Sequence, residues 1–166
     1  MKRFTLLLLF GLFWVPLDGK AQSIEKGWRG LQPFRSTRQD VETLFGKPKS
    51  ADKIWDIYDT PEGNLAIVYS AESCSNPSGN KGGFTVQKDT VLEYIVSLKN
   101  SFPLVELHWD RDRYERAADP HRLDVFVYGM RGEGVSITTG VIDGVESVGS
   151  FWFFGSDAQK RKFACR

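Results

Sequence analysis

Alternating hydrophobic and polar side chains predict β-strands over most of the chain after residue 53. Successive side chains of a strand point to opposite faces of a sheet, so a two-residue repeat marks a strand with one buried face. The repeat predicts strands at 54–58, 65–70, 90–98, 125–128, 135–139 and 145–154. Residues 60–64 and the pair Asp143 and Gly144 predict turns, and therefore hairpins, between neighbouring strands.

A short helix is predicted before these strands, over residues 37–45. It has an N-cap with a capping-box partner, one apolar face at helical spacing, and a glycine and a proline that end it. In that order, these residues are Thr37, Asp40, Val41, Leu44, Phe45, Gly46 and Pro48.

The helix and the strands after it resemble a motif of small bacterial envelope proteins. The families are the SmpA/OmlA outer-membrane assembly lipoproteins and the β-lactamase-inhibitory-protein fold. The residues that carry the resemblance are Thr37, Val41, Leu44, Phe45, Gly46 and Pro48. It implies a fold of helices on a curved antiparallel sheet and a binding role in the cell envelope. The chain departs from the lipoproteins because no cysteine for acylation lies near its predicted cleavage site.

We expect one α+β domain over residues 22–166, with short helices packed on a curved antiparallel sheet. The second half repeats the order of helix and three strands, with its helix expected at 113–118. A duplicated α-β-β-β unit explains this repeat, although a meander of hairpins gives a similar pattern. We favour the duplication.

Residues 1–21 are predicted to be a signal peptide for export. Lys2 and Arg3 precede an apolar stretch over 4–17, and Gly19 and Ala21 supply the small residues of a cleavage site. The apolar stretch is shorter than the roughly 20 residues of a membrane-spanning helix, which disfavours the alternative of an uncleaved anchor. We therefore expect a periplasmic or secreted protein without a stable membrane anchor.

The charge of the chain gives no reason to expect a nucleic-acid partner. The formal net charge is +1 for all 166 residues, far from the strongly basic balance of nucleic-acid-binding domains. The leader contains three basic residues and one acidic residue, so the exported part has a formal charge of −1. With 41 % hydrophobic residues, the chain can form a packed core.

Cys74 and Cys165 are the only two cysteines, and both lie in the exported part. Two cysteines allow only one pairing, and the oxidising compartment of an exported protein permits disulfides. They are therefore predicted to form a disulfide. A metal-binding or redox-active pair needs close spacing such as C-x-x-C, which these cysteines lack.

The nearest candidate for chemistry is a charged segment after residue 107. His108, Asp110 and Asp112 lie on one face of an extended chain, with His121 nearby, and such a set could bind a divalent cation. Four arginines are interleaved with it, so ion pairing on a solvated face is the interpretation we prefer. Those arginines are Arg111, Arg113, Arg116 and Arg122.

We identify no catalytic residue and expect neither a metal nor a cofactor. The serines lack a G-x-S-x-G context, and the loop at 79–83 is rich in glycine but lacks the residues of a phosphate-binding loop.

The candidate binding residues are four consecutive aromatics in the last predicted strand. Phe151 and Phe153 point to one face of that strand, whereas Trp152 and Phe154 point to the other. One face can belong to the core while the other is exposed to a partner, since aromatic residues are enriched at interface hot spots. We therefore predict an exported, non-catalytic module that binds a protein or associates with the envelope. The alternative is an envelope hydrolase with an unrecognised carboxylate or histidine site.

Overall fold

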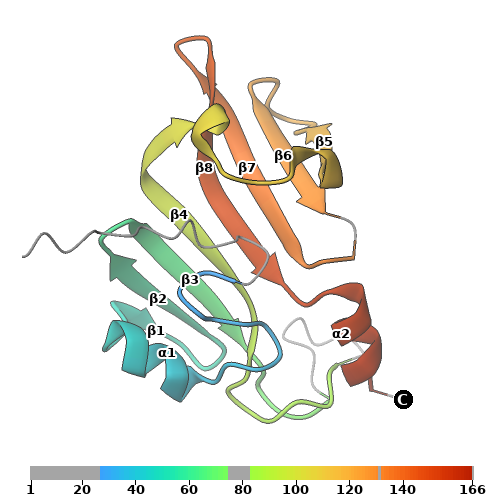
Figure 1. Cartoon of the computed structure of the whole chain (residues 1–166). Coiled ribbons are helices and arrows are strands. Elements are labelled where there is room, and N and C mark those ends of the chain that lie inside the picture. Colours follow the sequence, from blue (N-terminus) through green and yellow to red (C-terminus); the bar gives the residue numbers. More distant parts are fainter. Residues whose placement is uncertain (1–26, 75–82, 131, 166) are drawn as a thin grey trace, which may run out of the picture.

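A computed structural model describes residues 27–74, 83–130 and 132–165 (Figure 1). The predicted signal peptide and residues 79–82 of the glycine-rich loop lie outside the described residues. No helix in the described ranges is long and apolar enough to cross a membrane.

The helices and strands follow one another in two groups. The first group comprises α1 (Arg38–Phe45), β1 (Ser50–Ala51), β2 (Trp55–Thr60), β3 (Gly63–Tyr69) and β4 (Val91–Pro103). Two single-turn 3₁₀ helices then occur, η2 (Leu104–Glu106) and η3 (Arg111–Arg113). The second group comprises β5 (Glu115–Ala118), β6 (Val125–Met130), β7 (Val135–Ile142), β8 (Val145–Phe154) and α2 (Asp157–Phe163).

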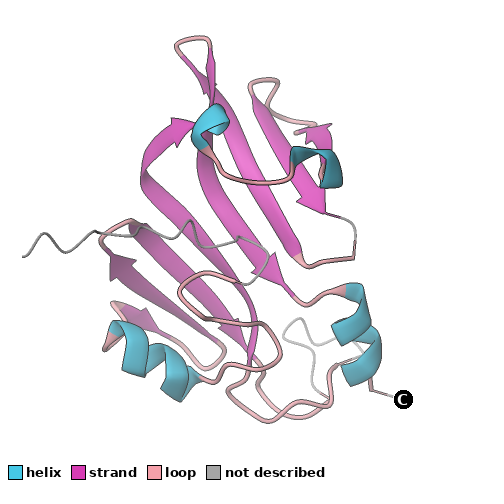
Figure 2. Cartoon of the chain, in the orientation of Figure 1, coloured by secondary structure: helices cyan, strands magenta, loops and turns pink. Residues whose placement is uncertain are grey.

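The eight strands of the described residues form one antiparallel sheet in the order β1-β2-β3-β4-β8-β7-β6-β5 (Figure 2). Each group of four strands is a meander, and β4 and β8 join the two meanders, with Ile95 opposite Trp152. The pairing of β4 with β8 breaks after Ser97, where residues 98–101 lie opposite Gly149 alone. The pairing resumes at Phe102, opposite Val148, so the sheet is continuous across its centre and has an irregularity in β4 at this junction.

This architecture corrects the prediction of an α+β fold. Of the described residues, 46 % lie in strands and 16 % in helices, so the fold is β-rich. The duplicated α-β-β-β unit is also wrong, because each half contributes four strands to the sheet and α2 follows the second set. Residues 113–118, predicted as a helix, contain β5 instead, because pairing with β6 provides hydrogen-bond partners for their backbone.

The predicted capping of α1 is confirmed. The Thr37 side chain accepts a hydrogen bond from the Asp40 backbone, and the Asp40 side chain accepts one from the Thr37 backbone. Val41 is fully buried and Phe45 stacks on Trp28 with 5.4 Å between ring centroids. Leu44, expected on the same apolar face, is half exposed, because only a narrow stripe of this two-turn helix contacts the sheet.

One face of the sheet, the inner face, carries the core. Residues 27–36, α1 and residues 104–113 lie over this face (Figure 1). They are anchored by specific contacts: the Tyr94 hydroxyl donates to the Leu31 carbonyl at 3.0 Å, and Trp109 packs edge-on against Tyr128. The fully buried side chains of this core include Tyr58, Leu65, Ile67, Tyr94, Val96 and Ile137.

Candidate functional site

The opposite face of the sheet, the outer face, carries a band of apolar side chains at its centre. Two cross-strand rows place them side by side. One row runs from Trp55 through Val68 and Glu93 to Phe154, and the other from Ile57 through Ala66 and Ile95 to Trp152. We call the apolar members the outer-face patch: Trp55, Ile57, Ala66, Val68, Ile95, Trp152 and Phe154.

The three largest exposures in the patch belong to residues from three different strands. Trp55 is 38 % exposed, Ile95 39 % and Trp152 41 %. A central strand position such as Ile95 stays exposed only when no element packs over it, so the described chain leaves the middle of this face open. Exposed large apolar groups at the centre of a sheet gain about 25 cal/mol per Å² when a partner removes them from water.

The aromatic residues of β8 divide between the two faces. Phe153 is buried and stacks on Tyr94 with 4.7 Å between ring centroids, and Phe151 packs at the edge of the same core. Trp152 and Phe154 are on the outer face, with their ring centroids 5.0 Å apart. Of the four candidate binding residues, only Trp152 and Phe154 therefore belong to the outer-face patch.

Charged groups lie beside both Trp55 and Phe154. At Trp55, Oδ2 of Asp52 accepts a hydrogen bond from the indole Nε1 at 3.1 Å. Glu93 is opposite Phe154 in the strand pairing and is partly buried. Lys160 of α2 places its ammonium nitrogen 4.7 Å from the centroid of the Phe154 ring, a cation–π contact. The patch is thus apolar at its centre and has one carboxylate and one ammonium group beside Phe154.

The predicted disulfide is confirmed. Cys74 and Cys165 are bonded, with 5.5 Å between their Cα atoms. Around the bond, the chain after α2 pairs with residues 83–85: Cys165 donates its backbone N–H to Gly83 and Thr85 donates to Phe163. The bond therefore fixes α2, and with it Lys160, beside the sheet.

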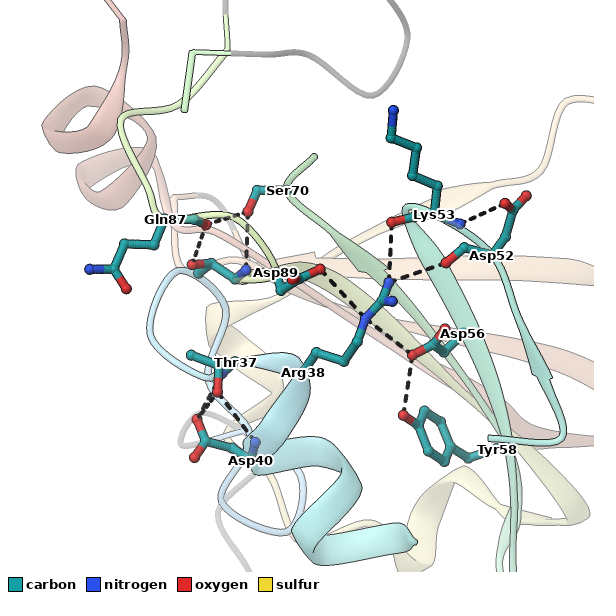
Figure 3. A network of polar contacts seen from close by, with 11 residues as sticks. Thr37, Arg38, Asp40, Asp52, Lys53, Asp56, Tyr58, Ser70, Gln87 and Asp89 are labelled. Atoms are coloured by element: carbon teal, nitrogen blue, oxygen red, sulfur yellow. Dashed lines mark hydrogen bonds and ion pairs between the residues drawn. The ribbon is translucent and has the colours of Figure 1, made fainter. Parts of the chain in front are cut away.

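A polar network lies where α1 meets β2 and β3 (Figure 3). Arg38 is at its centre. Its Nε lies 3.5 Å from Oδ2 of the buried Asp56 and 3.7 Å from Oδ1 of Asp89, and its guanidinium lies over the Tyr69 ring at 4.4 Å. Nη2 of Arg38 donates to the carbonyls of Asp52 and Lys53. Arg38 thereby connects α1 to the β1–β2 loop and to β2.

The tyrosines of this network are unsuited to acid–base chemistry at neutral pH. Burial raises the pKa of Tyr58 to about 12, and its hydroxyl donates to Asp56 Oδ2 at 3.3 Å. Burial also raises the pKa of Tyr69 well above its usual range. Both phenols therefore stay protonated near pH 7, and the network is best explained as a structural one.

The sequence carried a signal for this network that the motif search missed. Asp56 alternates with Tyr58, so the carboxylate shares a strand face with an aromatic side chain, and the structure buries that face. A charge at such a position requires a partner, and Arg38, next to the N-cap of α1, supplies it.

The charged segment after residue 107 does not converge on a site. His108, Asp110, Asp112 and His121 are all exposed. Among the described residues, no group of three or more His, Cys, Asp or Glu side chains could hold a metal ion. Three of the interleaved arginines form ion pairs: Arg116 with Glu146, Arg113 with Glu133 and Arg122 with Asp124.

Comparisons with known proteins add no family to this description. No protein-family model matches the chain, and neither a curated protein nor a solved structure matches it.

Proposed function

We propose that the protein is an exported, non-catalytic binding module whose outer-face patch contacts a partner protein of the cell envelope. The observation that carries this proposal is the joint exposure of Trp55, Ile95 and Trp152 from three strands at the centre of one sheet face. The disulfide between Cys74 and Cys165 is compatible with the oxidising compartment that export implies.

The chemistry of the patch favours a protein surface over a charged ligand. Tryptophan is enriched among residues that dominate binding energy, and a fairly flat apolar centre with a polar rim is typical of protein interfaces. The charged neighbours of the patch lie in or beside the row of Trp55 and Phe154, and the row of Ile95 and Trp152 is wholly apolar. An apolar or aromatic surface on the partner is therefore the expected complement.

The test is site-specific photo-crosslinking in cells that make the protein. A photoreactive amino acid replaces Ile95 in the patch, or Leu123 as a control, because Leu123 is 90 % exposed on the loop between β5 and β6. We expect a defined crosslinked product from position 95 that is absent from position 123.

A second variant tests whether the patch itself holds the partner. Trp152→Ala in the position-95 protein is expected to abolish the crosslink, since one buried interface tryptophan contributes about 2 kcal/mol or more. Val141→Ala is the matched control, because Val141 is also 41 % exposed but lies near the end of β7. Equal products from positions 95 and 123, or a crosslink that survives Trp152→Ala in a folded protein, contradict the proposal.

The alternative of an envelope hydrolase has no such observation in its favour. Asp56 and Glu146 both accept hydrogen bonds from tyrosine hydroxyls, and the partly buried Glu62 and Asp89 pair with arginines. We therefore develop the binding function alone.

A further inference from the structure

A second candidate site lies on the inner face, at the far end of the sheet from α1. Here the segment of residues 104–113 crosses in front of the second meander (Figure 1). Between this segment and the start of β8 is a hollow of about 280 Å³, which we call the Trp109 pocket. Its lining is Leu104, Val105, Leu107, Trp109, Arg111, Val145 and Glu146.

The aromatic wall of this pocket is held in place from behind. The Trp109 ring packs edge-on against Tyr114, with 4.6 Å between centroids, and against Tyr128, with 5.2 Å. A ring fixed by two edge-on neighbours keeps one orientation and loses little entropy when a ligand contacts it.

The aliphatic wall is exposed to solvent. Val105 of η2 is 89 % exposed and Val145 of β8 is 46 % exposed, and both line the hollow. A ligand with an apolar body between them removes this surface from water, which stabilises the complex.

The carboxylate in the pocket is already compensated. Oε1 of Glu146 accepts hydrogen bonds from the Tyr128 hydroxyl at 3.0 Å and from the Thr139 hydroxyl at 2.7 Å. Oε2 of Glu146 lies 3.6 Å from Nη2 of Arg116. Glu146 thus has three partners within the protein and needs none from a ligand.

The guanidinium in the pocket, in contrast, has no anionic partner in the part of the chain that the structure describes. Arg111 lies at the pocket with its guanidinium carbon 5.9 Å from the Tyr128 ring centroid. The next two arginines along the chain, Arg113 and Arg116, are each paired with a glutamate. The uncompensated charge of the pocket is therefore positive.

From this combination we infer that the Trp109 pocket binds a small amphipathic carboxylic acid. Its aromatic or branched aliphatic body lies against Trp109 between Val105 and Val145, and its carboxylate pairs with Arg111. The volume is just below the range of about 300–1,000 Å³ typical of small-molecule sites, which limits the body to roughly one or two rings. Arg111 is suited to this role because guanidinium groups bind carboxylates through two parallel hydrogen bonds.

The test compares an acid with its neutral amide, since the two share one apolar body. Indole-3-acetate and indole-3-acetamide are titrated into the purified protein by calorimetry, and the Trp109 side-chain N–H signal is followed by NMR. We expect the acid to bind roughly tenfold or more tightly than the amide, because a charge-assisted pair is lost in the amide. We expect the Trp109 signal to shift with the acid.

Three variants locate the binding. Arg111→Gln is expected to lower the affinity for the acid to that for the amide. The control is Arg122→Gln, because Arg122 is exposed and pairs with Asp124 in the loop before β6. We expect this control to leave the difference between acid and amide unchanged. Val105→Glu, at a position too exposed to disturb folding, is expected to weaken the acid roughly tenfold or more, because it places a negative charge at the pocket.

Several results overturn the inference. These are absence of acid binding at millimolar concentration, equal affinity for acid and amide, or a tenfold preference that survives Arg111→Gln. Failure here leaves the outer-face proposal intact, because the two sites lie on opposite faces and their tests share no variant.

Discussion

At the scale of single residues, the tyrosines report how tightly the inner face is packed. Tyr58, Tyr69, Tyr94 and Tyr128 are each almost completely buried. Burial is the main cause of the raised pKa of all four, because a phenolate loses its hydration there. The folded protein therefore favours the protonated form of each phenol.

This predicts stability that is lost at high pH. For Tyr58, whose folded pKa is raised from 10 to about 12, the stabilisation is fully present below pH 10 and disappears as the pH rises through about 12. Phenolate absorbance should therefore appear late, together with the loss of tertiary circular dichroism above about pH 11. Titration of all the tyrosines near pH 10 in a protein that remains folded would show that the inner face is open to solvent.

Gly155, between β8 and α2, is predicted to be essential for packing. A Cβ atom added there would lie 2.1 Å from Cε2 of Phe34, a ring that also stacks on Phe163 of α2. Gly155→Ala therefore forces Phe34 to move and should lower the free energy of unfolding by about 1–3 kcal/mol. Urea denaturation measures this change.

Gly129→Ala is the matched control, because an added Cβ there meets no atom within 4 Å. We expect its effect to stay within about 0.5 kcal/mol. Equal effects of the two substitutions would mean that Phe34 adjusts without cost.

At the scale of elements, α2 depends on contacts that are distant in sequence. It has seven residues, too few for a stable isolated helix, and none of them is fully buried. Its support comes from the capping box of Ser156 and Gln159, from Phe163 against Phe34, and from the disulfide at Cys165.

Removal of the disulfide should therefore loosen α2 before the sheet. In a variant with Cys74→Ser and Cys165→Ser, we expect the free energy of unfolding to fall by about 2–5 kcal/mol. Hydrogen exchange should quicken in α2 more than in β3 or β4, which pair along most of their length. Uniformly faster exchange in all elements would show that the bond stabilises the fold only globally.

The local elements could be predicted from the sequence because their signals are local. The two-residue repeat predicted β2, β3, β4, β6, β7 and β8, and the capping residues predicted α1. The helix α2 was missed, although Ser156 and Gln159 have the spacing of a capping box. β5 was mistaken for a helix because four residues are too few to establish a period.

At the scale of the whole molecule, the fold depends on strand pairing between residues that are distant in sequence, which local sequence patterns do not predict. The pairing of β4 with β8 brings Ile95 to Trp152, and nothing near either residue in sequence specifies that partner. This one pairing turns two meanders into a single sheet and corrects the α+β prediction. It also assembles the outer-face patch from both halves of the chain.

The same limit applied to the candidate sites. Alternation in β8 correctly separated Phe151 and Phe153 from Trp152 and Phe154, but both pairs are aromatic, so the sequence left open which face is covered. The Trp109 pocket could not be predicted from the sequence, because it depends on the path of residues 104–113 across the inner face, which only the tertiary structure shows.

The central position of β8 has a consequence for the order of folding. β4 is synthesised well before β8. Until β8 is made, the edge of β4 that will pair with it, including Ile95, has no strand beside it. An unpaired edge with apolar side chains is prone to join with other chains. The first meander therefore passes through a vulnerable interval during biosynthesis, and slow synthesis of the second meander should increase aggregation without any change in the stability of the finished protein.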